Sequence, residues 1–148
     1  MVRPYDGRTY HYRDDDGAPE GLAIVCRVLG LASAPDDVRY DIELYSGGIG
    51  VIDRLAISFP ATPARVGAIV MKLSGGLRDD EELRWLLDVE EGPIGPAAIA
   101  FVNENRRDFQ APCTDATELW FAPESGVNHW EVVWVVDGVL SYLAYDQG

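Results

Sequence analysis

The sequence predicts an α+β protein in which two helices pack on one face of a mostly antiparallel sheet of about six or seven strands. Apolar and polar residues alternate with a period of two in several segments, which is typical of half-buried strands. The period becomes helical after Pro60, and a strong hairpin signal closes the chain. At 148 residues, 47% of them hydrophobic, the chain has the length of one domain, so we expect a single domain over residues 1–148.

Four segments of the N-terminal half are predicted as strands. Residues 3–13 alternate loosely and suit an edge strand, whereas residues 22–31 form a nearly continuous apolar run that favours a buried strand, with a short helix as the alternative. Residues 38–45 alternate most clearly, so one face of this strand is expected to meet solvent. A glycine-rich turn at 47–50 then leads into a strand over 51–59.

A helix is predicted near residues 63–74. Thr62 is a good N-cap residue, and Pro63 suits the first helical position because its missing N–H costs nothing there. The apolar residues that follow have helical spacing: Val66, Ile69, Val70 and Leu73. These signals place one apolar stripe of the helix against the sheet.

A second helix is predicted near residues 80–89, after the stop at Gly75–Gly76. Asp79, with Glu82 three residues later, resembles a capping box. The helix would bury Leu83, Leu86 and Leu87. Its start carries four carboxylates that favour the positive end of the helix dipole: Asp79, Asp80, Glu81 and Glu82.

The C-terminal third is predicted as strands over 97–102 and 118–121, followed by a hairpin over 130–145. Asp137–Gly138 is favoured in a two-residue type I′ turn, in which both central residues have positive φ. The turn fixes the cross-strand pairs: Val136 with Val139, Trp134 with Ser141, Val132 with Leu143 and Trp130 with Tyr145. Because both faces of this hairpin are largely apolar, we expect it inside the sheet and covered on both sides.

The charge of the chain limits the classes of partner. Twenty-five acidic residues against 12 basic ones give a net charge of −13, which opposes attraction to nucleic acid and anionic membranes. The sequence shows neither a signal-peptide core nor a membrane span, so a cytoplasmic protein is expected. Eleven arginines and one lysine, with many Ala and Gly residues, indicate a GC-rich bacterial genome.

Motifs for catalysis or cofactor binding are weak, and we predict no metal site and no cofactor. Gly48–Ile49–Gly50 leads into a strand and is interpreted as a hairpin turn rather than a phosphate loop. Cys113, His129 and Asp115 supply the residue types of a thiol hydrolase, which remains one alternative function. The run 14–17 lacks the spacing of a calcium loop and is interpreted as a solvated turn.

The strongest functional signal is the distribution of charge towards the C-terminus. Residues 108–148 contain seven acidic residues, many aromatic residues, and neither Lys nor Arg. Carboxylates steer a cationic partner and aromatic residues supply contact area, so the leading hypothesis is a non-enzymatic inhibitor or immunity protein that neutralises a basic toxin or nuclease. An α+β domain that binds an apolar small molecule is another alternative. The predicted partner-binding residues are Asp79, Asp80, Glu81, Glu82, Glu118, Trp120, Phe121 and Glu124.

Overall fold

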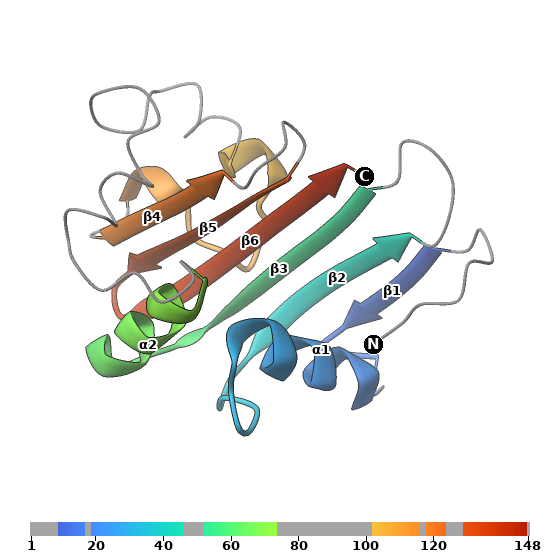
Figure 1. Cartoon of the computed structure of the whole chain (residues 1–148), viewed down its shortest axis with the longest axis horizontal. Helices are drawn as coiled ribbons and strands as arrows, with labels where there is room; N and C mark the ends of the chain where they lie inside the picture. Colours follow the sequence, from blue (N-terminus) through green and yellow to red (C-terminus); the bar gives the residue numbers. More distant parts are fainter. Residues whose placement is uncertain are drawn as a thin grey trace.

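The computed structural model describes residues 9–16, 19–45, 52–73, 102–115, 118–123 and 129–147 (Figure 1). The described elements follow one another along the chain as β1 (Thr9–Arg13), α1 (Pro19–Leu29), β2 (Arg39–Tyr45), β3 (Ile52–Pro60), α2 (Pro63–Leu73), the 3-10 helix η1 (Cys113–Asp115), β4 (Glu118–Pro123), β5 (His129–Val136) and β6 (Val139–Gln147). Among these residues, no helix has the length and apolar character needed to cross a bilayer.

The described strands form one antiparallel sheet in the order β1-β2-β3-β6-β5-β4. Its centre joins the two halves of the chain, because β3 pairs with β6 from Ile52 opposite Gln147 to Pro60 opposite Val139. β1 lies at one edge and β4 at the other. The α+β class and the antiparallel sheet predicted from the sequence are confirmed.

The C-terminal hairpin has the predicted register. Asp137 and Gly138 both have positive φ, 50° and 76° respectively, as a type I′ turn requires. The observed pairs are those predicted: Val136 with Val139, Trp134 with Ser141, Val132 with Leu143 and Trp130 with Tyr145. β5 and β6 lie inside the sheet, so their two apolar faces are used by the core on both sides.

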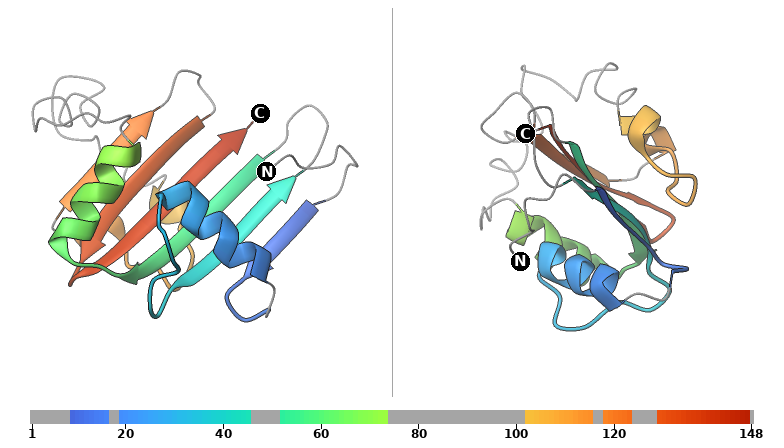
Figure 2. Two further views of the ribbon diagram at one scale, coloured as in Figure 1. Left: turned by 60° about the horizontal axis from the view of Figure 1, so that its bottom comes forward. Right: turned by 90° about the vertical axis from the view of Figure 1, so that its right-hand side faces the viewer.

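Both α1 and α2 cover the same face of the sheet, which we call the helical face (Figure 2). α2 begins as predicted, because the side-chain oxygen of Thr62 accepts a hydrogen bond from the backbone N–H of Arg65 at 3.2 Å. The main core of the protein lies under these helices. Its buried members include Ile24, Val25, Leu29, Tyr40, Ile42, Ile57, Phe59, Ile69, Leu140 and Tyr142.

The prediction of a strand over 22–31 is wrong, since this run lies within and just after α1. Gly21, Ile24, Val25 and Leu29 are buried with helical spacing, but further apolar residues at the flanks conceal the period. The helix ends in a Schellman motif, in which Gly30 has a φ of 69° and the N–H of Leu31 donates to the carbonyl of Cys26 at 2.8 Å. A glycine directly after an apolar run is typical of a helix C-terminus, so Gly30 is the residue in the sequence that favours a helix over a strand here.

Several predicted elements lie outside the described residues. These are the turn at 47–50, the helix near 80–89 and most of the strand at 97–102. Val102 itself is described and begins a helical turn over 102–105, so at this position the strand prediction is wrong.

The opposite face of the sheet is covered by residues 102–115, which we call the covering segment (Figure 2). Val102 and Cys113 of this segment pack with Trp134 and Leu143 of the hairpin. Gln110 is buried, and its side-chain nitrogen donates to the backbone carbonyl oxygens of β3 and β6 at positions Ile57 (3.1 Å) and Tyr142 (2.9 Å). These contacts fix the covering segment across the centre of the sheet.

Candidate functional site

Most predicted partner-binding residues lack a described side chain. The acidic run 79–82 and Glu124 lie outside the described residues. Glu118 and Phe121 belong to β4, but only their backbone positions are described. Trp120 is half-buried and packs against the core of the helical face, so part of its ring is used inside the protein.

Cys113, the nucleophile of the hydrolase alternative, belongs to the covering segment and is buried in the core between this segment and the sheet. Burial raises the pKa of its thiol, and the lowering effects of a backbone hydrogen bond and the charge of Arg106 are smaller. A cysteine nucleophile needs an accessible thiol with a depressed pKa. The side chains of Asp115 and His129 are not among those described. The described thiol therefore has the properties of a structural cysteine.

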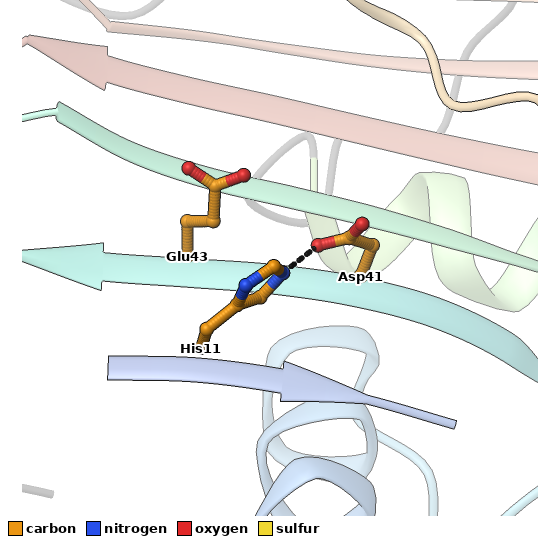
Figure 3. A group of neighbouring side chains, drawn as sticks. All are labelled: His11, Asp41 and Glu43. Carbon is orange, nitrogen blue, oxygen red and sulfur yellow. Dashed lines mark hydrogen bonds and ion pairs between the residues drawn. The ribbon is translucent and has the colours of Figure 1, made fainter. Parts of the chain in front are cut away.

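A polar cluster that the sequence analysis missed lies on the sheet face opposite the helices. We call it the His11 cluster, and it consists of His11, Arg13, Asp41, Glu43 and Arg107. Strand pairing places His11 opposite Glu43 and Arg13 opposite Asp41. Figure 3 shows the ring of His11 on β1 directed at the carboxylate of Asp41 on β2, with Glu43 beside them on β2. The alternate residues of these strands, such as Tyr12 and Ile42, pack in the core of the helical face.

The closest contact of the imidazole among the described residues is with Asp41. The ring nitrogen Nε2 of His11 lies 2.5 Å from Oδ1 of Asp41 (Figure 3). Nε of Arg13 lies 3.2 Å from the same ring nitrogen and 4.0 Å from Oδ2 of Asp41. A single imidazole nitrogen cannot donate to Asp41 and accept from Arg13 at the same time. The shorter contact favours an Nε2–H group that donates to the carboxylate.

Arg107 connects the covering segment to this cluster. Its guanidinium group pairs with Glu43, and its Nε lies 3.4 Å from Oδ2 of Asp41. The Nε atom is buried, yet it forms no hydrogen bond among the described residues. In the same region, the guanidinium of Arg39 lies 5.2 Å from the centre of the Phe109 ring, a cation–π arrangement. The cluster thus attaches the covering segment to the outer strands of the sheet.

The chemistry of the cluster combines a nitrogen donor with two carboxylates. The ligand atoms of His11, Asp41 and Glu43 all lie within 4.8 Å of one another. Imidazole and carboxylate groups are ligands for Zn²⁺ and related ions. This arrangement is not visible in the sequence, because His11 and Asp41 are 30 residues apart. Asp41 and Glu43 are two residues apart, so the sequence pattern does place both carboxylates on one face of the strand. That His11 lies beside them follows only from the pairing of β1 with β2.

A separate electrostatic feature surrounds Tyr40 at the start of β2. Burial raises the pKa of Tyr40, and the negative charges of Asp16, Asp14 and Asp15 raise it further. The backbone N–H of Asp14 donates to the carbonyl of Tyr40 at 3.2 Å, so the acidic turn after β1 is held beside this tyrosine. The negative potential of the turn therefore extends into the protein.

Comparisons with known proteins give no family from which a role could be transferred. No family model matches the chain, and no curated protein or solved structure is significantly similar to it. The function is therefore inferred from the charges and contacts of the chain itself.

Proposed function

We propose that this chain is a non-enzymatic, acidic protein-binding module that neutralises a basic protein, such as a toxin or a nuclease. The observation that supports this proposal is that basic and acidic side chains differ in their surroundings. Several basic side chains are engaged in contacts that hold the fold together, whereas many carboxylates are exposed. The resulting surface favours a cationic partner.

Basic side chains make internal contacts in several parts of the fold. Lys72 of α2 donates to the carbonyl oxygens of Arg27 and Val28 at 3.2 and 2.9 Å, near the end of α1. Arg106 donates to the carbonyl of Gln110 at 2.8 Å, within the covering segment. Ion pairs link Arg107 to Asp41 and Glu43, and Arg39 to Asp14. These positive charges are therefore partly neutralised or held against backbone carbonyls.

Exposed carboxylates lie in several parts of the described surface. The following acidic residues are exposed and form no ion pair with another described residue: Asp15, Glu20, Asp36, Asp37, Glu104, Asp108 and Asp137. Charges of one sign raise the local concentration of an oppositely charged partner and speed its association. They provide steering rather than most of the binding energy.

The contact surface itself is proposed to include the acidic run 79–82 and the edge strand β4. Glu118, Trp120 and Phe121 belong to that strand, and Glu124 follows it. Aromatic residues at the centre of an interface commonly supply much of the binding energy, and the surrounding charges set the association rate. This division of roles can be tested separately for the two groups of residues.

The layer between the sheet and its two helices is a packed core, and this argues against the alternative of a binding site for an apolar small molecule. Phe59, Ile69, Leu140 and Tyr142 are almost fully buried between sheet and helices. Their side chains fill the layer that such a ligand would occupy. The raised pKa of Cys113 likewise gives no support to thiol hydrolysis.

An experiment on the adjacent gene tests the proposal, because an inhibitor is normally encoded beside its target. The adjacent gene would be expressed in bacteria with and without this chain, and the two purified products would then be mixed. We expect the adjacent product to be basic, to slow growth when expressed alone, and to form a stoichiometric complex that abolishes its activity. An adjacent product that neither binds nor is inhibited would contradict the proposal.

A further inference from the structure

We propose that the His11 cluster binds a divalent transition-metal ion, such as Zn²⁺, through His11, Asp41 and Glu43, and that Arg107 competes with the ion for the two carboxylates. This inference is independent of the proposed inhibitor function. It depends on the geometry of β1 and β2, which contain none of the predicted partner-binding residues.

Strand pairing places the three ligands next to one another. Asp41 and Glu43 lie two residues apart on β2, and backbone pairing holds His11 opposite Glu43. Bonds of about 2.0–2.2 Å to a shared ion place its ligand atoms about 3–4 Å apart. The three ligand atoms lie within 4.8 Å of one another, so side-chain rotations bring them to a common ion without a change in the strands. When the ion binds, the coordinating nitrogen of His11 gives up its proton to solvent, and the contact of His11 with Asp41 is replaced by bonds from both residues to the ion.

The donor set has the chemistry of a transition-metal site. One imidazole nitrogen and two carboxylates suit Zn²⁺, Mn²⁺ or Fe²⁺, whereas Ca²⁺ and Mg²⁺ prefer oxygen ligands alone. The side chains of His11 and Glu43 are about one-third exposed, at 34% and 32%. An ion can therefore reach the site from solvent, and three protein ligands leave a position for water or for a donor from another molecule.

Arg107 supplies a positive charge that a metal ion would displace from the two carboxylates. Its guanidinium group pairs with Glu43, and its buried Nε lies 3.4 Å from Oδ2 of Asp41 without forming a hydrogen bond among the described residues. Arg107 is 26% exposed, so its side chain can turn towards solvent when a dication takes over the carboxylates. Gln110 and Trp134 still attach the covering segment to the sheet in that state.

Zinc titration of the full chain tests this site. After treatment with a chelator, the protein would be titrated with Zn²⁺ in a calorimeter, and imidazole nitrogen resonances would be followed by NMR. We expect one tight site and a shift of the His11 ring nitrogens. Replacement of a ligand, in His11→Ala or Glu43→Gln, should weaken binding about 10-fold or more. The matched control Glu104→Gln, which removes an exposed carboxylate in the covering segment, should leave binding unchanged.

A substitution of Arg107 tests the competition between this residue and the metal ion. Arg107→Gln removes the charge and keeps a polar, though shorter, side chain, and it should bind Zn²⁺ more tightly than the wild type. Circular dichroism checks that each variant is folded. If His11→Ala does not fold, His11→Gln is used in its place. Undiminished binding in the folded His11 variant would overturn the site. Unchanged or weaker binding in Arg107→Gln would overturn the competition.

Discussion

Gly21 of α1 lies directly against the ring of Tyr40 in β2. A β-carbon at Gly21 would lie 2.5 Å from Cε2 and 2.9 Å from the hydroxyl oxygen of Tyr40. Alanine normally favours a helix over glycine by about 1 kcal/mol, but here it would overpack a buried contact, which typically costs about 1–3 kcal/mol. We therefore expect Gly21→Ala to lower the free energy of unfolding, measured by urea denaturation.

Gly67 of α2 provides the matched control. It is exposed, and a β-carbon there would have no neighbour within 4 Å. Gly67→Ala should raise the free energy of unfolding by about 0.5–1 kcal/mol, as expected from helix propensity alone. Equal stabilisation by both substitutions would show that α1 does not approach β2 this closely.

A second prediction concerns Gln110, the buried residue that holds the covering segment. Its amide nitrogen donates to two sheet carbonyls, and its oxygen accepts from the backbone N–H of Arg107 at 3.0 Å. Gln110→Ala leaves that N–H without its partner and opens a cavity, so we expect a loss of about 2–4 kcal/mol in unfolding free energy. Faster hydrogen exchange in the covering segment should accompany it. Asp108→Asn, at an exposed site nearby, should change stability by less than about 0.5 kcal/mol; equal effects would argue against the anchoring role.

A third prediction concerns the two thiols. Burial raises the pKa of Cys113, so its thiol stays protonated at neutral pH and should react slowly with iodoacetamide. Cys26 is only half-buried and should be alkylated first. Peptide mass spectrometry over time distinguishes the two sites. Rapid, selective labelling of Cys113 in the folded protein would instead support the hydrolase alternative.

A fourth prediction follows from the raised pKa of Tyr40. The unfolded chain releases the phenolic proton near pH 10, whereas the folded chain holds it to higher pH. The contribution of this tyrosine to stability is therefore fully present below about pH 10 and is lost as pH rises through the folded pKa. Urea denaturation at increasing pH should show a steeper alkaline loss of stability for the wild type than for Tyr40→Phe. Identical pH profiles would contradict the raised pKa.

The elements of the fold that can be predicted from the sequence are those marked by specific turn or capping residues. Asp137–Gly138 fixes the turn and therefore every pair along β5 and β6, and Thr62 marks the start of α2. The sequence pattern favours a strand in the place of α1, because the apolar residues of this helix are not confined to one stripe and therefore conceal the helical period. Local periodicity is informative only where one face of an element is polar.

The His11 cluster could not be predicted, because it depends on which strands become neighbours. Asp41 and Glu43 share a strand, and their common face is visible in the alternation of the sequence. His11 joins them through the pairing of β1 with β2, and Arg107 joins them through the path of the covering segment. Both relationships are non-local. The charge imbalance behind the proposed function, by contrast, is a property of composition and is visible in the sequence.

The most direct test of the proposed function is the association rate of the chain with the adjacent gene product at low and high salt. We predict that salt slows association strongly, and that reversing the charges of residues 79–82 slows it further and flattens the salt dependence. Trp120→Ala should mainly speed dissociation, by an amount equivalent to about 2 kcal/mol for an interface hot spot. Association that is insensitive to salt, to that reversal and to reversal of Glu118 and Glu124 would contradict an acidic module that captures a basic partner.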